Sequence, residues 1–309
     1  MELIVGIPRA LLFYKYKDLW LQFFANLNIK TVISPKTNKE IIDKGSSYVV
    51  DEACLSLKIF MGHVDYLQNK CNYIFIPRVA CLNKNEKMCT NFLALYDLVK
   101  NTFEDCKILM YNVDVENNEY EFDGFLKIGK TLGFSYFKTL RAYQNAKKYE
   151  KEKRRQKYLL ETRKLRSPHL KILVVAHSYN LYDDFVGKSI LEYLESQRIA
   201  AICSDITTGD EKVNTSISHS IYWTYNKELM KIIEDTLNHI DGIILISTFP
   251  CGPDSLCNEL IIRKIKSKPI LYLTCDNNAS DTGIITRLES FIDILKYKKE
   301  RSTNDQQYN

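Results

Sequence analysis

Residues 242–246 read Gly-Ile-Ile-Leu-Ile, and residues 251–255 read Cys-Gly-Pro-Asp-Ser. The first stretch is typical of a buried strand, and the second leads into a helix-like run. Open α/β folds place their ligands at such strand-to-helix turns. A thiolate at Cys251 would face the positive end of the following helix, which favours a negatively charged ligand. Cys54 and Cys89 lie in comparable polar turns, so three distant cysteines predict a cofactor site assembled across domains.

Strand-like and helix-like segments alternate along the whole chain. Strands are expected at 3–5, 31–33, 73–76, 108–110, 172–175, 200–202, 243–246 and 270–273, with the third ended by Pro77. Helices are expected at 19–27, 38–43, 55–67, 92–99, 134–165, 184–195, 227–237, 256–265 and 284–295. This alternation predicts an α/β fold in which helices cover both faces of mostly parallel sheets.

The long helix expected at 134–165 ends before Ser167-Pro168, because proline disfavours helix at the residue before it. This helix lies between two similar halves of the chain. We therefore expect an N-terminal α/β domain at 1–132, a basic linker helix at 133–168, a C-terminal α/β domain at 169–296 and a disordered tail at 297–309. The stretch 147–166 holds ten Lys/Arg and three Glu, a net +7, which leaves −2 for the rest of a chain of net +5. We interpret this basic stretch as a solvated helix face rather than a surface for nucleic acid.

The composition is that of a water-soluble globular protein. The chain has 309 residues, of which 45% are hydrophobic and 26% charged. No apolar run approaches the roughly 20 residues needed to cross a bilayer, and the first residues read as a strand rather than a signal peptide. We therefore expect a cytoplasmic protein without membrane association. Nine cysteines in such a chain argue against a disulfide framework.

Six separated blocks together resemble one protein family, in order and in spacing, from about Leu3 to Phe291. They are Gly6-Ile7-Pro8-Arg9-Ala10-Leu11, Val50-Asp51-Glu52-Ala53-Cys54, Phe75-Ile76-Pro77-Arg78 with Cys89, His177-Ser178-Tyr179-Asn180, Cys251-Gly252-Pro253-Asp254-Ser255, and Thr286-Arg287-Leu288-Glu289. The chain is similar to the acyl-CoA dehydratase activase-related proteins. That family resembles the iron–sulfur subunits of 2-hydroxyacyl-CoA dehydratases, such as 2-hydroxyglutaryl-CoA dehydratase, and the double-cubane-cluster proteins.

The resemblance implies two flavodoxin-like or Rossmann-like domains with an iron–sulfur cluster between them. The cluster would be [4Fe–4S] or a double-cubane cluster, with Cys54, Cys89 and Cys251 as its metal ligands. It also implies an ATP-dependent activase partner that delivers low-potential electrons for the reduction or dehydration of a small substrate. A second dehydratase-like subunit, or a second copy of this chain, is a further implied partner.

Two regions depart from the family pattern. Thr90 and Asn91 follow Cys89, where the family has Pro-Lys, and Asn277-Asn278 follow Asp276 in place of a Glu-His pair. His177, Tyr179 and Asp276 are the candidate catalytic residues. The departures leave two alternatives to an enzyme component: a non-catalytic cluster-carrying electron relay or scaffold, and a metal-free module that binds acyl-CoA or another anion through Arg9 and Arg78.

Residue spacing alone is weak evidence for a cluster. The chain has no Cys-x-x-Cys motif, so Cys251 alone could also be a nucleophile, a zinc ligand or a core residue. Cys81 and Cys275 are reserve ligands, and Cys203 has the setting of a core residue. His63, inside the helix expected at 55–67, is interpreted as a hydrogen-bonded packing histidine.

Overall fold

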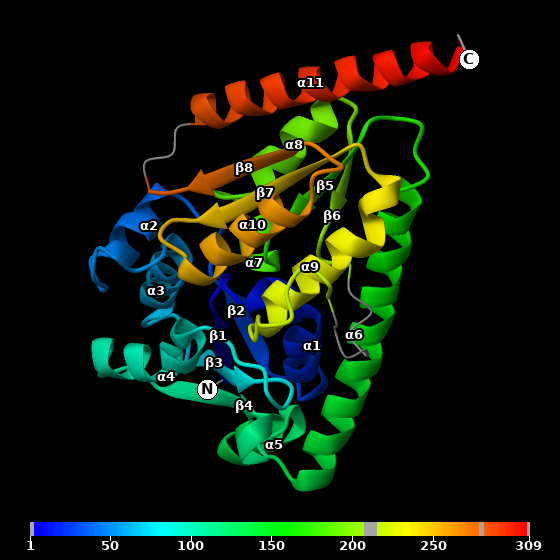
Figure 1. The fold of residues 1–309 in the computed structure, drawn as a ribbon. Helices are drawn as coiled ribbons and strands as arrows, with labels where there is room; N and C mark the ends of the chain where they lie inside the picture. Colours follow the sequence, from blue (N-terminus) through cyan, green and yellow to red (C-terminus); the bar gives the residue numbers. More distant parts are fainter. Residues whose placement is uncertain (1–2, 207–214, 278–280, 308–309) are drawn as a thin grey trace. The chain divides into compact units, whose positions relative to one another are not determined.

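A computed structural model describes residues 3–206, 215–277 and 281–307. The chain forms two compact units (Figure 1). Unit 1 comprises Met1–Gln156 and Tyr222–Tyr225, and unit 2 comprises Lys157–Ile221 and Asn226–Asn309. The division falls inside the long helix, between residues 156 and 157, whereas the sequence suggested a separate linker at 133–168.

Each unit contains a four-stranded sheet in which all pairs are parallel. In unit 1 the order is β2 (Lys30–Ile33), β1 (Ile4–Ile7), β3 (Tyr73–Cys81) and β4 (Ile108–Asp114). In unit 2 the order is β6 (Ala200–Cys203), β5 (Lys171–Val175), β7 (Gly242–Thr248) and β8 (Ile270–Cys275). Both match the flavodoxin-like order 2-1-3-4, so the predicted fold class is confirmed.

Helices connect successive strands in both units. Unit 1 contains α1 (Phe13–Asn26), α2 (Lys39–Ser46), α3 (Leu55–Leu67), α4 (Thr90–Thr102), the 3-10 helix η1 (Val115–Asn117) and α5 (Glu121–Thr131). The long helix α6 (Tyr136–Lys164) passes into unit 2, which contains α7 (Ser178–Leu181), α8 (Lys188–Ser196), most of α9 (Thr224–Thr236), η2 (Leu237–His239), α10 (Gly252–Lys264) and α11 (Asp281–Gln307). In Figure 1, α10 covers one face of the unit 2 sheet and α8 the other.

The cores form where apolar strand runs meet the apolar faces of helices. Every residue of β7 is buried, as expected for a strand between two helical layers. The core of unit 1 is aromatic: Trp20 packs edge-on against Phe75 with ring centroids 4.8 Å apart, and Phe23 lies 4.5 Å from Phe125. Such pairs add specific geometry to the hydrophobic burial.

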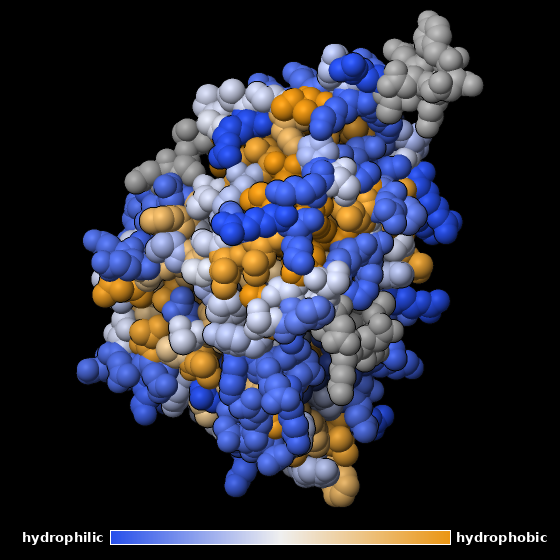
Figure 2. All heavy atoms as spheres, viewed as in Figure 1, coloured by the Kyte–Doolittle hydropathy of each residue, from blue (hydrophilic) through white to orange (hydrophobic). Residues whose placement is uncertain are grey.

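Two features of unit 1 were not predicted. Strand β3 does not end at Pro77 but continues to Cys81, and Pro77 pairs with Tyr111 of β4. Proline is tolerated there because β1 pairs with β3 only at Tyr73 and Ile74 in the described residues, so no β1 partner needs the missing N–H. Helix α5 was also missed. It buries Phe125 and Ile128, while its surface in Figure 2 is mostly hydrophilic.

Helices α2 and α3 cross at two glycines. A Cβ atom on Gly45 would lie 1.8 Å from the carbonyl oxygen of Lys58, and one on Gly62 would lie 1.9 Å from that of Ile41. Both neighbours are backbone atoms, which cannot move without moving a helix. The crossing therefore requires glycine at both positions, and it fixes α3 and the turn before it against α2.

The carboxyl-terminal part of α6 covers the edge strand of the unit 2 sheet. Glu161 accepts a hydrogen bond from the Cys203 backbone N–H at 2.8 Å, and Lys164 donates to the Ala201 carbonyl at 3.0 Å. These bonds satisfy backbone groups that an edge strand otherwise exposes. The basic helix is thus docked at this end rather than solvated throughout. Helix α11 continues to Gln307, through residues for which a tail was expected.

Across the described ranges, none of the helices is apolar over a length that would span a bilayer.

Candidate functional site

Each of the three predicted ligand cysteines is the N-cap residue of a helix. Cys54 precedes α3, Cys89 precedes α4 and Cys251 precedes α10, and all three have extended backbone dihedrals. Each of these helices leads back into the next parallel strand, so it begins at the carboxyl edge of its sheet. Backbone N–H groups of a first helical turn point at this position and favour negative charge. The prediction that these cysteines lie at helix starts is therefore confirmed.

In unit 1 the first turns of α3 and α4 are neighbours. The Asn91 side-chain amide, in the first turn of α4, donates a hydrogen bond to the Cys54 sulfur at 3.5 Å. Cys54 and Cys89 are both partly exposed thiols. Asn91 is one of the residues that depart from the family pattern, and here it supplies a hydrogen bond to a predicted ligand sulfur.

In unit 2 the turn at Cys251 contains a buried polar network. The Asp254 carboxylate lies 2.7 Å from His177 Nε2 and accepts a hydrogen bond from the Asn226 amide at 3.0 Å. It also accepts a hydrogen bond from the Cys251 thiol. Asp254 is 4% exposed and His177 is 6% exposed. Burial alone would raise the pKa of Asp254, but the His177 interaction and the three hydrogen bonds outweigh it and the pKa is lowered.

This network lies at the point where the connections of the unit 2 sheet diverge. His177 follows β5, whose chain continues to β6, while Cys251 follows the neighbouring β7, whose chain continues to β8 on the other side. In open α/β sheets such a divergence at the carboxyl ends of two adjacent strands forms the ligand crevice. The Tyr179 ring stacks on His177, with centroids 5.0 Å apart and an interplanar angle of 18°. The predicted residues His177, Tyr179 and Cys251 are thus brought together.

The third catalytic candidate has a different setting. Asp276 is exposed directly after β8. Burial first, and then the Asp276 charge, raise the pKa of the buried reserve ligand Cys275 to about 11. Asn277 is described, whereas Asn278 lies outside the described residues.

Other singled-out residues have structural partners. The Nε2 atom of His63 lies 3.0 Å from Thr37 Oγ1 in the core. Arg9 donates to the Ser34 carbonyl at 3.1 Å, and Arg78 donates to Asn112 at 2.6 Å. The buried Cys81 thiol donates to a backbone carbonyl at 2.8 Å. These contacts within the fold favour a structural role for the four side chains over a role in ligand binding.

Thiol side chains, such as those at the three helix starts, are the donor type that a thiophilic metal centre uses. Thiolates hold iron–sulfur clusters, and hydrogen bonds to their sulfurs tune them. Cys54 already accepts such a bond from Asn91. A Cβ atom on Gly252, directly after Cys251, would meet no described atom within 4 Å outside its own stretch of chain, so the backbone there is accessible. Within the described residues, no group of three or more His, Cys, Asp or Glu side chains is gathered closely enough to hold a metal ion.

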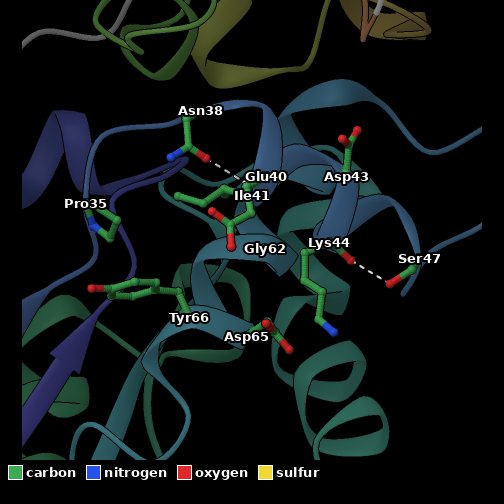
Figure 3. Close-up of a pocket in the computed structure, with 10 residues that line it drawn as sticks. All are labelled: Pro35, Asn38, Glu40, Ile41, Asp43, Lys44, Ser47, Gly62, Asp65 and Tyr66. Carbon is green, nitrogen blue, oxygen red and sulfur yellow. Dashed lines mark hydrogen bonds between the residues drawn. The ribbon is translucent and has the colours of Figure 1, made fainter.

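A cavity of about 800 Å³ lies beside the α2–α3 crossing (Figure 3). Pro35 and Tyr66 lie at one end, and Asp43 and Lys44 at the other. Its lining includes more acidic than basic side chains and none of the predicted site residues. It is therefore separate from the helix starts that carry the candidate chemistry.

The roles of Asp254 and Asn226 were not predicted from the sequence. Asp254 was recognised only as part of the Cys251 turn, and Asn226 not at all. The local signal for Asp254 was its place three residues after the N-cap, where acidic residues favour the helix dipole. Nothing near Asn226 indicates its partner, which lies 28 residues away.

Comparison with known proteins assigns the chain to a family. No curated protein sequence matches the chain. The family described as CoA enzyme activase uncharacterised domain matches residues 4–207, about two thirds of the chain. The matched range includes Cys54, Cys89 and His177, whereas Cys251 and Asp254 lie beyond it. The chain therefore belongs to the CoA enzyme activase uncharacterised domain family, among the acyl-CoA dehydratase activase-related proteins.

Proposed function

We propose that the chain is an iron–sulfur protein that takes low-potential electrons from an ATP-dependent activase for the reduction or dehydration of a small substrate. Cys54, Cys89 and Cys251 are the proposed thiolate ligands. The observation that carries the proposal is that all three residues cap helices at the carboxyl edges of parallel sheets. The electron-driven chemistry and the ATP-dependent activase are what the sequence resemblance implies, and the match to a CoA enzyme activase domain supports the activase-related part.

The groups around the proposed ligands would stabilise negative charge, donate hydrogen bonds and exchange protons. The helix N-termini favour the negative charge of thiolates and sulfides. Asn91 donates to the Cys54 sulfur and fixes its direction. When bound, a cluster with three protein ligands would supply electrons and one iron that is open to a substrate oxygen. His177, which contacts Asp254 and stacks on Tyr179, would exchange a proton beside Cys251.

The metal-free alternative has little support from the contacts. It required Arg9 and Arg78 to bind an anion, and both donate to groups within unit 1. The non-catalytic relay would use the same cluster ligands as the proposed enzyme component. It would differ only in that it does not convert a substrate. It would be favoured if a cluster-loaded protein accepted electrons from an activase and ATP without converting any acyl-CoA.

The direct test is iron and acid-labile sulfide analysis after anaerobic reconstitution. We expect a brown protein with about four irons per cluster. Cys54→Ala, Cys89→Ala and Cys251→Ala should each lower the iron content. Cys106→Ala is the matched control, because Cys106 is also a partly exposed thiol but precedes β4 at the opposite edge of its sheet. A colourless wild-type protein, or equal iron in all four variants, would overturn the proposal.

A further inference from the structure

Two cysteines line one cavity at the amino-terminal edge of the unit 1 sheet. The cavity measures about 490 Å³, and Cys71 and Cys106 both belong to its wall. Cys71 comes just before β3 and Cys106 just before β4, which are neighbouring strands of the sheet. Both thiols are partly exposed. The cavity therefore gives small molecules and ions access to a pair of thiols, at the edge opposite to Cys54 and Cys89.

The pairing of the two strands brings these cysteines close together. Ile74 lies level with Ile108, and the Ile74 N–H donates to the Lys107 carbonyl at 2.8 Å. Continuing this register backward puts Cys106 level with the residue after Cys71. Adjacent strands lie about 4.8 Å apart and rise about 3.3 Å per residue, so the two Cα atoms would be about 6 Å apart. Burial first, and then the charge of Cys71, raise the pKa of Cys106 to about 11, as expected for neighbouring thiols.

The backbone around Cys71 fixes the position of its sulfur. The thiol donates to the Leu67 carbonyl at 3.4 Å. A Cβ atom on Gly6 of β1 would lie 2.6 Å from the Cys71 Sγ atom, so the sulfur occupies space that glycine leaves open. Burial raises the pKa of Cys71 as well, so both sulfurs carry protons at neutral pH. An ion that binds both sulfurs must therefore displace two protons.

The number of donors at this cavity selects the kind of ion. In the described ranges, the two cysteines belong to no metal-holding group of three or more His, Cys, Asp or Glu side chains. Structural zinc takes four ligands, and iron–sulfur clusters are held by sets of thiolates. Soft thiolates also select Cu(I), a filled-shell ion that two sulfur donors can satisfy. An accessible pair of thiols therefore fits Cu(I) better than zinc or an iron–sulfur cluster.

We propose that Cys71 and Cys106 form a two-thiolate site for one Cu(I) ion. On binding, each S–H bond breaks, its proton passes to solvent and a Cu–S bond forms in its place. Copper keeps its oxidation state, so no electron is transferred. The site does not depend on the proposed function, because the proposed cluster ligands of unit 1 lie at the other edge of the sheet.

The test titrates reduced protein anaerobically with Cu(I) supplied as its bicinchoninate complex, whose colour fades as copper moves to the protein. The three proposed cluster ligands are replaced by alanine in every sample, so they cannot contribute. We expect one Cu(I) per chain, lost to the same extent in Cys71→Ser, in Cys106→Ser and in the double variant, because one thiolate does not complete the site. Cys257→Ala is the control, because Cys257 is a buried thiol of α10 and should leave uptake unchanged.

Two further readouts use protein that keeps both cysteines, so a serine variant that fails to fold does not decide the outcome. The displacement of two protons should make the Cu(I) affinity rise about 100-fold per pH unit around neutral pH, after correction for the competitor. Mass spectrometry after iodoacetamide treatment should show that copper protects Cys71 and Cys106 together. Full uptake in either serine variant, an affinity that rises only about tenfold per pH unit, or protection of only one thiol would overturn the inference.

Discussion

Replacing Asp254 by alanine should destabilise the candidate site of unit 2 more than any surface change on the same helix. The substitution removes the acceptor that lies 2.7 Å from His177 and 3.0 Å from the Asn226 amide. Both partners are almost fully buried, so water cannot replace the lost bonds. Breaking a buried pair of this kind costs about 3–5 kcal/mol. Asp254→Asn keeps one oxygen acceptor and should cost less, about 1–3 kcal/mol.

The pH dependence of this effect has a defined sign. The pKa of Asp254 is lower in the folded protein than in the unfolded chain, where it is about 3.9. Its stabilising contribution is therefore fully present above about pH 4 and is lost as the pH falls through the lower folded value. The wild type and Asp254→Asn should differ clearly at neutral pH, and their stabilities should converge in strong acid.

Hydrogen exchange, measured by mass spectrometry on peptides from α10 and β7, reports the local stability of unit 2 around Asp254. We expect faster exchange in these peptides for Asp254→Ala, and a smaller change for Asp254→Asn. Glu259→Gln is the matched control, because Glu259 lies on the same helix in an exposed pair with Arg263 and should leave the exchange unchanged. Equal exchange in Asp254→Ala and Glu259→Gln would show that the buried Asp254 network does not stabilise this part of unit 2.

Three other substitutions test the fold and the site. Gly62→Ala would place a Cβ 1.9 Å from the α2 backbone, so we expect a net loss of about 2 kcal/mol, seen as a lower thermal midpoint, after helix propensity offsets part of the overpacking; an unchanged midpoint would contradict the close crossing. Glu161→Leu removes the acceptor for the Cys203 amide and should cost about 1–3 kcal/mol, with faster exchange of that amide and no change at β8. Asn91→Leu removes a donor to the Cys54 sulfur, so a reconstituted cluster should keep its iron but show a more negative midpoint potential by EPR-monitored titration; a more positive potential would contradict that role.

The parallel fold was predictable because its signals are local. The helix expected at 55–67 has those bounds in the structure, since its apolar residues recur at helical spacing throughout. The buried runs before Cys251 and His177 predicted two of the central strands. Alternating elements then restrict the topology to a few parallel arrangements. The prediction for Pro77 was wrong because tolerance of proline depends on which strand lies beside it, and sequence does not show that.

The candidate site was only partly predictable, for the same reason. The three cysteines were found because polar turns after or before buried runs are visible in sequence. The partners of Asp254 come from the turn after β5 and from the start of α9, which are 77 and 28 residues away. The hydrogen bond between Ser247 and Tyr272 likewise depends on the register between β7 and β8, in which Ser247 lies beside Thr274. Such contacts appear only when the sheet is assembled.

We propose above that sulfur atoms of this chain's helix-capping cysteines bind iron. Iron K-edge X-ray absorption of the anaerobically reconstituted protein tests it most directly. We expect a first coordination shell dominated by sulfur, with iron–iron scattering from a cluster, and loss of both signals when Cys54, Cys89 and Cys251 are replaced together by alanine. A first shell of oxygen or nitrogen without iron–iron scattering, or a spectrum that the triple substitution leaves unchanged, would contradict it.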